Sequence, residues 1–453
     1  MKTKKTITDN TVDPDILAYT VGDDPVLDRD LVVWDCMGTA AHVTMLARMR
    51  LKTPVVTKAE AKAVCTELAH IVDEHRKGKF SIKVEDQDVH MAVERVLTER
   101  LGDLGKKIHT GRSRNDQVAV DVRLHMKDEL LSLEGELVKL MDALVSLGRK
   151  HDLVPLVGRT HLQPAMPSSV GMWSTGHAEM VLDQLENLEA AYRLVDLNPL
   201  GSAAGYGVPL PLNRKLTTKL LGFARPIHNC FGASMARGEC EAAVLGALAQ
   251  LMAVLSRLAE DLILFSMPEF AYFKLPREYC TGSSIMPQKF NPDVLELVRS
   301  KAAQVLGLSV ASLSMLHAMP GGYNRDLQDS KFLYMEGLDV TRTTVRILAK
   351  VVKGVEVDPE QCRRAFTPGV FATDVALRKV AEGTPWRDAY HDVRDHLEQL
   401  ESEDPDRAVA AKKHLGATGG IDYDHYRSAI ADAFGAMLDR RVKFEKCLHA
   451  LVG

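Results

Sequence analysis

The feature that most constrains the fold of this 453-residue sequence is a set of long segments in which apolar residues recur at every third or fourth position. In the first segment this spacing is kept by six leucines: Leu130, Leu133, Leu137, Leu140, Leu144 and Leu147. Residues three or four positions apart lie on one face of an α-helix, whereas a half-buried β-strand alternates apolar and polar residues. Hardly any stretch shows that alternation. The sequence therefore predicts an all-α protein with no convincing sheet.

Five long helices are expected from this spacing. They run over about residues 118–151, 172–197, 238–267, 293–316 and 331–355. Because short loops join them, we expect an elongated bundle. The third helix is apolar on most of its faces and needs neighbours on several sides. This predicts that copies of the chain pack together into an oligomer.

Shorter elements are expected before the bundle. The first ~20 residues are polar, and Asp13-Pro14 and Pro25 interrupt any regular element, which predicts an extended arm. Helical spacing begins between Val33 and His75, where Thr57 is placed to form a capping box with Glu60. We therefore expect a helical N-terminal region behind the arm.

The part of the chain after the bundle is divided into shorter helices by three prolines: Pro368, Pro385 and Pro405. We therefore expect three domains. They are an N-terminal helical domain with an extended arm (1–108), a central domain holding the five long helices (109–357) and a small C-terminal helical domain (358–453).

The composition is that of an ordinary globular protein, with 46% hydrophobic and 26% charged residues. A formal net charge of −4 gives no reason to expect binding to nucleic acid or to a membrane surface. The longest uncharged apolar run, Ala242–Ser256, is shorter than the roughly 20 residues of a membrane span and predicts a buried helix. Seven cysteines without a Cys-x-x-Cys pair, and the lack of a signal-peptide pattern, predict reduced thiols and a cytoplasmic location.

Four polar stretches lie at the ends of the expected long helices and carry hydroxyl, amide, imidazole and cationic side chains. They are HTGRSRND at 109–116, GRTHLQPA at 158–165, GSSIMPQKFNPD at 282–293 and GGYNRDLQDSK at 321–331. Each has an ordinary structural explanation, such as a helix cap, a surface salt bridge or a histidine satisfied inside the core. Brought together, they would supply enough donors to bind a dicarboxylate.

The stretch from Gly282 to Glu296 is the most informative of the four. Its glycine and two serines favour a mobile turn, and Asn291 followed by Pro292 is a good N-cap and first-position pair for a helix. A flexible loop carrying Lys289 is thus expected to lead directly into a helix N-terminus. Such a loop can close over an anion and supply a serine. A surface loop with an ordinary helix cap explains the same residues equally well.

Other kinds of site fit the sequence less well. It contains no His-Glu-x-x-His, no Cys-x-x-Cys and no dense cluster at metal-ligand spacing, so no metal is expected. The glycines between Gly201 and Gly207 follow a helix and not a strand, which argues against a dinucleotide cofactor. A Gly-x-Ser-x-Gly elbow is absent, so Ser283 lacks the context of a hydrolase nucleophile. No cofactor is expected.

Several motifs match one known family in order and spacing. They are HTGRSRNDQVA at 109–119, THLQPA at 160–165, SRLAEDLIL at 256–264, GSSIMPQK at 282–289, YN and DLQ within 323–328, and FATD at 371–374. By these motifs the chain resembles the fumarase/aspartase superfamily, and most closely its argininosuccinate lyase family with the δ-crystallin relatives. The resemblance implies an all-α fold whose long helices assemble into a tetrameric core. It also implies a carbon–nitrogen lyase of arginine biosynthesis, which splits argininosuccinate reversibly into arginine and fumarate by anti β-elimination.

The resemblance assigns the catalytic groups. Ser283 would be the base that removes a proton and leaves an aci-carboxylate intermediate, and cationic and N–H neighbours would have to stabilise its alkoxide. Lys289 would do this and, with Asn291, would bind the carboxylate that takes up charge. His161 would pair with Glu296 in an acid or orienting role.

The resemblance also implies contacts to both halves of the substrate. The succinyl half would be bound by Ser113, Arg114, Asn115 and Thr160. The amino-acid half would lie against Tyr323, Gln328 and Lys331. In the family each site is built from three subunits, which implies a homotetramer.

Three residues depart from the family pattern. Asp24 stands where a serine contacts the arginine end of the substrate, Gly238 lies in an altered S-x-R-D motif, and Phe290 replaces the second lysine of a K-K-N run. Asp24 and the lost lysine would suit a more cationic leaving group. Two alternatives therefore stay open. One is a lyase that releases fumarate from a different N-substituted aspartate, and the other is a catalytically silent structural relative.

Overall fold

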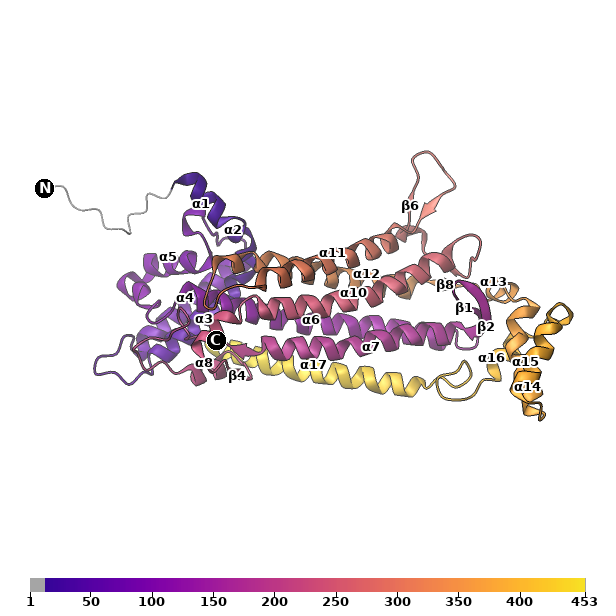
Figure 1. The fold of residues 1–453 in the computed structure, drawn as a ribbon. Helices are drawn as coiled ribbons and strands as arrows, with labels where there is room; N and C mark the ends of the chain where they lie inside the picture. The colour runs from indigo at the N-terminus through magenta and orange to yellow at the C-terminus, as the bar shows by residue number, and fades with distance from the viewer. Residues whose placement is uncertain (1–12, 453) are drawn as a thin grey trace.

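Long helices lie side by side along an elongated, mainly helical molecule (Figure 1). The computed structural model describes residues 13–452. The five expected helices are present as α6 (Arg114–Lys150), α7 (Val170–Val195), α10 (Glu239–Ser266), α11 (Asp293–Leu316) and α12 (Ser330–Gly354). All six leucines that define the spacing in α6 are buried. The all-α prediction is confirmed.

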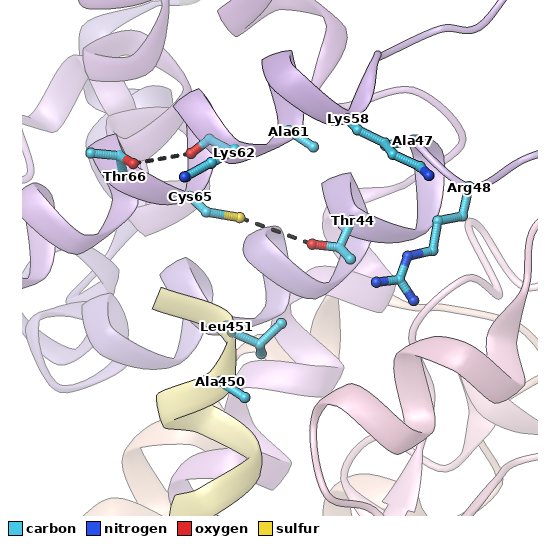
Figure 2. Close-up of a pocket in the computed structure, with 10 residues that line it drawn as sticks. All are labelled: Thr44, Ala47, Arg48, Lys58, Ala61, Lys62, Cys65, Thr66, Ala450 and Leu451. Carbon is cyan, nitrogen blue, oxygen red and sulfur yellow. Dashed lines mark hydrogen bonds between the residues drawn. The ribbon is translucent and has the colours of Figure 1, made fainter. Parts of the chain in front are cut away.

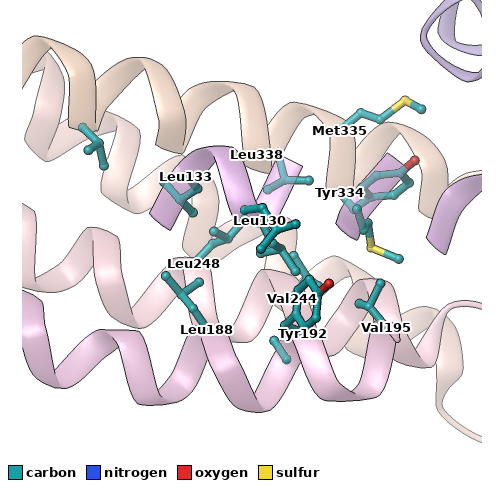
Figure 3. Packing of buried hydrophobic residues seen from close by; sticks show 14 of the residues in the cluster. Leu130, Leu133, Leu188, Tyr192, Val195, Val244, Leu248, Tyr334, Met335 and Leu338 are labelled. Atoms are coloured by element: carbon teal, nitrogen blue, oxygen red, sulfur yellow. The ribbon is translucent and has the colours of Figure 1, made fainter. Parts of the chain in front are cut away.

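Helix α10 lies at the centre of the bundle, in contact with α7, α11 and α12. Figure 3 shows Val244 and Leu248 of α10 in a buried cluster with Leu188 of α7. Burial of each such side chain contributes roughly 1.5–3 kcal/mol to stability. Within residues 13–452, α10 alone is long and apolar enough to cross a membrane by length and composition, and 61% of its most apolar window is buried. The buried helix expected over Ala242–Ser256 is confirmed.

The C-terminal part differs from the expectation of short helices only. Short helices do follow the bundle: α13 (Pro359–Arg364), α14 (Ala372–Ala381), α15 (Trp386–Asp395) and α16 (Pro405–Ala410). They are followed by α17 (Tyr423–Val452), a 30-residue helix that packs on α6 and returns along the bundle to the N-terminal helices (Figure 1). The Arg440 and Arg441 side chains of α17 pair with Glu134 and Asp128 of α6. The division at 108 and 357 stays a prediction, and α17 belongs physically with the bundle.

The N-terminal region is helical earlier than expected. Its helices are α1 (Pro14–Val21), α2 (Asp24–Leu27), α3 (Val32–Leu46), α4 (Lys58–Arg76) and α5 (Val89–Leu101), with a 3-10 turn at Asp28–Leu31. An extended arm is wrong for residues 14–21, because Asp13 caps α1 by accepting the N–H of Asp15 and Pro14 fits the first helical position. The start of the expected arm lies outside the described residues. The predicted capping box of Thr57 and Glu60 on α4 is confirmed.

The strands are short and form two-stranded sheets. β1 (Pro155–Thr160) pairs antiparallel with β2 (Gln163–Ser169), and β6 (Thr281–Gly282) pairs antiparallel with β7 (Phe290–Asn291). The remaining pairs are β3 (Leu197–Asn198) with β4 (Arg225–Pro226), and β5 (Phe273–Lys274) with β8 (Glu356–Val357). The connection between α10 and α11 includes β6 and β7. Two small helices, α8 (Arg214–Leu220) and α9 (Cys230–Met235), complete the connection from α7 to α10.

Candidate active site

The Ser283 loop projects from one end of the bundle between β6 and β7 (Figure 1). Two backbone N–H groups point at its hydroxyl. That of Met286 donates to Ser283 Oγ across 3.0 Å, and that of Ile285 across 3.3 Å. Donors aimed at an oxygen stabilise negative charge on it. The local geometry is therefore suited to a serine that acts as a base.

The residues that follow Ser283 are mostly exposed. Lys289 forms no ion pair with any residue between 13 and 452, so its ammonium group is available to an anion. The predicted helix cap at Asn291 is wrong, because Asn291 ends β7 and its amide donates to Thr281 Oγ1 at 3.5 Å. Helix α11 begins after Pro292, without a side-chain cap.

Phe290 acquires a structural role that the sequence did not reveal. The guanidinium group of Arg277 lies 3.3 Å from the centre of its ring, and such a contact at an exposed site contributes about 0.5–1 kcal/mol. Phe290 also lines a cavity of about 440 Å³ that reaches Pro292 and Glu296 at the base of the loop. This cavity adjoins the loop that carries Ser283.

His161 and Leu162 form the two-residue turn between β1 and β2. Both have positive φ angles, 52° and 61°, which residues with a side chain adopt rarely. The Arg159 guanidinium donates to the carbonyl oxygen of Leu162 at 3.0 Å and supports the turn. His161 is exposed at the tip, with Thr160 before it, so the alternative of a core histidine is wrong. Within one subunit, residues 13–452 contain no ion pair between His161 and Glu296, and their pairing across subunits stays a prediction.

Ser113 lies at the opposite end of the bundle, where it caps α6. Its Oγ accepts the N–H of Asn115 at 3.3 Å, and Asp116 accepts the Ser113 N–H at 2.9 Å in return. The second oxygen of Asp116 accepts the N–H groups of Gly201 and Ala203, at 2.9 and 3.0 Å. Asp116 therefore ties the 201–203 loop to the start of α6. The Ser-x-x-Asp spacing of a capping box was the signal that could have revealed it.

Arg114 is held by its neighbours at this same end. Its guanidinium pairs with Asp88 and reaches Gln87 Oε1 at 3.5 Å. Both partners lie just before or at the cap of α5. The α5 cap and the first turn of α6 thus position Arg114 together, with 41% of its side chain left accessible.

The residues expected to contact the amino-acid half also lie at the Ser113 end. Lys331 is buried, with Nζ 2.7 Å from Asp24 Oδ1 and 2.5 Å from Asp28 Oδ1. Gln328 donates from Nε2 to the carbonyl oxygen of Thr20 at 3.0 Å. Lys331 is therefore engaged by carboxylates of the N-terminal region, a contact that sequence reasoning missed.

Tyr323 lies beside the same group. The Arg237 guanidinium stands 5.2 Å from the centre of its ring, and Arg237 is itself 5% exposed. Arg237 precedes Gly238, whose φ of +81° starts α10 in a conformation that favours glycine. The altered motif around Gly238 thus forms a helix start that places Arg237 against Tyr323.

A buried cluster of ionisable groups lies beneath the start of α6. His90 Nδ1 contacts Asp35 and lies 3.6 Å from Asp121 Oδ2. Burial raises the pKa of the Asp121 carboxyl well above its usual value, and the Asp35 charge adds to the rise. Burial opposes protonation of His90, but the carboxylates around it, Asp35 first and then Asp88 and Asp28, together outweigh burial and raise the pKa of the imidazole. The ligand atoms of Asp35, His90 and Asp121 are close enough to hold a metal ion. This cluster was not expected from the sequence, because its residues are too far apart in the sequence to form a local metal-ligand motif.

The predicted site residues thus fall at two opposite ends of one subunit. Ser113 caps the start of α6, whereas Thr160 follows its end, and α6 has 37 residues. At 1.5 Å per residue that helix is roughly 55 Å long, far beyond the reach of any side chain. The β6–β7 loop, which carries Ser283, lies at the same end of the molecule as β1 and β2 (Figure 1). Tyr323 precedes α12, whose first turn holds Lys331 against Asp28 of the N-terminal region, at the Ser113 end. One subunit therefore does not bring the two sets together.

A further cavity, of about 490 Å³, contains none of the predicted site residues. Figure 2 shows it between α3, α4 and the end of α17, with Arg48, Lys58, Lys62 and Cys65 among the residues that line it.

The chain is similar to known lyases over most of its length. A family model described as Lyase matches residues 28–307. The argininosuccinate lyase of Sorangium cellulosum (strain So ce56) is 43% identical over 412 residues, which cover 91% of this chain and 95% of that protein. The argininosuccinate lyase of Parabacteroides distasonis is 41% identical over 431 residues, 95% of each chain.

Solved structures share the fold at lower identity. The crystal structure of EDDS lyase in complex with formate aligns with a TM-score of 0.77 and 23% identity, covering 96% of this chain and 92% of that one. The recombinant class II fumarase from Schistosoma mansoni aligns with a TM-score of 0.69 and 17% identity, covering 92% and 95%. These likenesses establish the fold, and the closer relatives establish the family. The chain belongs to the argininosuccinate lyase family of the fumarase/aspartase superfamily and is a carbon–nitrogen lyase.

Proposed function

We propose that this lyase splits argininosuccinate reversibly into arginine and fumarate, with Ser283 as the base. The observation that carries the proposal is the Ser283 hydroxyl, which accepts two backbone N–H groups in a loop that also carries Lys289, whose ammonium group has no ion-pair partner among residues 13–452. Membership of the argininosuccinate lyase family supports the choice of substrate. The seven free cysteines are consistent with the cytoplasmic location that we also propose.

In the proposed reaction, Ser283 as its alkoxide takes a proton from the substrate carbon next to a carboxylate. The electron pair left on that carbon is delocalised into the carboxylate, which becomes a doubly charged aci-carboxylate. That electron pair then forms the new C=C bond while the C–N bond breaks, and the departing guanidino nitrogen takes up a proton. Lys289 and Asn291 bind the carboxylate whose charge doubles. A cation and an amide donor stabilise the doubly charged intermediate more than they stabilise the singly charged carboxylate of the bound substrate.

His161 and Glu296 act together across a subunit boundary in this proposal. The exposed imidazole at the β1–β2 tip meets the carboxylate on the first turn of α11 in another subunit, and the pair keeps the imidazolium available as an acid or an orienting group. Thr160, which precedes His161 at the end of β1, binds the succinyl half of the substrate. Ser113, Arg114 and Asn115 contribute to the same half from a third subunit.

Such a site requires an oligomer, and we propose a homotetramer. The two-ended placement of the site residues supports it, because one subunit separates them by the length of α6. An apolar face on α11 also supports it. Leu306, Val310 and Leu313 follow helical spacing and are 56–57% exposed, which is unfavourable in water and suits burial against another copy.

A different N-substituted aspartate is the second candidate substrate. The observation that favours it is Asp24, which places an extra carboxylate at the end of the site that receives the amine half. A catalytically silent relative is disfavoured, because the proposed base, cation and imidazole are all present.

Fumarate absorbance with argininosuccinate as substrate tests the proposal. We expect turnover by the wild type and a loss of at least about 10³-fold in kcat for Ser283→Ala, since the base is removed. Ser284→Ala, on the exposed neighbour in the same loop, is the matched control and should retain activity. Unchanged activity of Ser283→Ala would refute the role of the base. Fumarate release from another N-substituted aspartate, but not from argininosuccinate, would show that the second candidate is the substrate.

A further inference from the structure

Three cationic side chains line a cavity that contains none of the predicted site residues. The cavity, of about 490 Å³, lies between α3, α4 and the end of α17 (Figure 2). Arg48 and Lys58 stand on one side of it and Lys62 on the other. None of its lining residues belongs to the four polar stretches of the sequence that supply the proposed active site. The cavity is therefore not part of that site.

The three cations of this cavity are not neutralised by carboxylates. Within residues 13–452, Arg48, Lys58 and Lys62 form no ion pair. Glu60, which lies between the two lysines in the sequence, pairs with Lys107 instead, at 3.0 Å. Among the described residues, no aspartate or glutamate lines the cavity. Its charge is therefore wholly positive, and an anion is the ligand that balances it.

The rest of the lining is neutral and partly apolar. Burial raises the pKa of the Cys65 thiol, so this group stays uncharged, and its Sγ lies 4.0 Å from the Thr44 hydroxyl oxygen. Ala61 of α4 and Leu451 of α17 form an apolar wall and are both buried. The cavity therefore combines three cations with a surface that suits the apolar part of a ligand.

We propose that this cavity binds a small organic phosphate, a phosphate monoester with an apolar body. Such a group carries about −1.5 to −2 charges at pH 7 and three acceptor oxygens. It can therefore receive the planar fork of Arg48 through two oxygens and still contact the ammonium groups of Lys58 and Lys62. A single carboxylate carries one charge and two oxygens, and leaves part of this cationic set without a partner.

The size of the cavity and the charge of the whole chain favour a soluble ligand. Sites for small molecules occupy roughly 300–1,000 Å³, and the cavity of about 490 Å³ lies within this range. The formal net charge of −4 opposes attraction to an anionic membrane. A dissolved monoester is therefore favoured over the phosphate of a lipid headgroup.

Calorimetric titration of the intact enzyme with phenyl phosphate tests the assignment. This probe carries both a phosphate monoester and an apolar ring, whereas phenol keeps the ring alone. For the wild type we expect a Kd on the order of 0.1–1 mM for phenyl phosphate and no saturable binding of phenol. In Arg48→Gln and in Lys62→Gln the Kd of phenyl phosphate should rise roughly 10-fold, because each variant loses a charge-assisted contact.

Lys52→Gln is the matched control. Lys52 is an exposed cation of the segment between Arg48 and Lys58, and it does not line the cavity. The same charge is removed from the same segment, so the Kd of phenyl phosphate should stay at the wild-type value. Fumarate release without phenyl phosphate should be unchanged in every one of these variants, which verifies that they are folded.

Four results would overturn the assignment. The first is an unchanged Kd in both Arg48→Gln and Lys62→Gln, and the second is an equal rise in Lys52→Gln. A Kd that rises in Lys289→Gln but not in Arg48→Gln would place phenyl phosphate in the active site instead. Sedimentation of the enzyme with vesicles of phosphatidylcholine and phosphatidic acid, lost in Arg48→Gln, would identify a lipid headgroup as the ligand.

Discussion

At the scale of single residues, a histidine inside the bundle makes stability depend on pH. His125 of α6 lies between helices, with Nδ1 3.3 Å from the Tyr334 hydroxyl of α12. Burial lowers the pKa of His125 from 6.5 to about 4. Between about pH 6.5 and pH 4, His125 is therefore protonated in the unfolded chain but neutral in the folded chain. The stability that comes with the neutral imidazole is complete above pH 6.5 and is lost as the pH falls toward 4.

His125→Gln should remove this dependence while keeping an acceptor for Tyr334. Between pH 7 and pH 5 we expect the wild type to lose about 2 kcal/mol more of its free energy of unfolding than the variant does. Urea titrations of both proteins at the two pH values measure the difference. Equal losses in both proteins would show that His125 titrates normally in the folded state.

At the scale of elements, the β1–β2 hairpin carries strain in its turn. Leu162 has a φ of 61° and is 73% exposed, so its side chain contributes little packing to offset its conformation. Glycine adopts this φ without steric cost, whereas a β-branched residue adopts it least readily.

Glycine and valine at position 162 should therefore have opposite effects on the stability of the protein. We expect Leu162→Gly to be at least as stable as the wild type, and Leu162→Val to lose about 1–2 kcal/mol of unfolding free energy. Thermal unfolding at a fixed protein concentration measures the relative stabilities of the wild type and the two variants. A valine variant as stable as the glycine variant would show that the turn is not strained.

The elements differ in how far sequence predicts them. The long helices were predictable because each repeats its apolar residues over many turns, and α11 was expected with the bounds that it has. Helix α17 carries the same spacing at Ile430, Phe434, Met437 and Phe444, but the prolines before it suggested short helices throughout. The β1–β2 turn was missed because His-Leu lacks the Asn-Gly signal of such turns.

At the scale of the whole molecule, the active site is the part that sequence places least well. Local motifs predict the site residues, but contacts such as that between Lys331 and Asp28 join positions 303 residues apart, and no periodic pattern encodes them. The structure separates the Ser283 loop from the Ser113 cap by the length of the bundle. The central claim is therefore that a complete site takes each part from a different copy of the chain.

Mixed oligomers test this claim. Ser283→Ala and Asn115→Ala subunits, each inactive alone, are produced together with different affinity tags, and complexes that carry both tags are isolated. If the two parts come from different subunits, about a quarter of the sites in a random mixture contain neither substitution. The matched control combines Ser283→Ala with Lys289→Ala, whose positions lie on one loop of one subunit, so no site escapes both.

The decisive measurement is the rate of fumarate release by these isolated mixed complexes. Restoration toward a quarter of the wild-type rate for the Ser283→Ala and Asn115→Ala mixture, with none for the control, is the predicted result. No restoration in the first mixture, despite mixed complexes being present, would contradict a site shared between subunits.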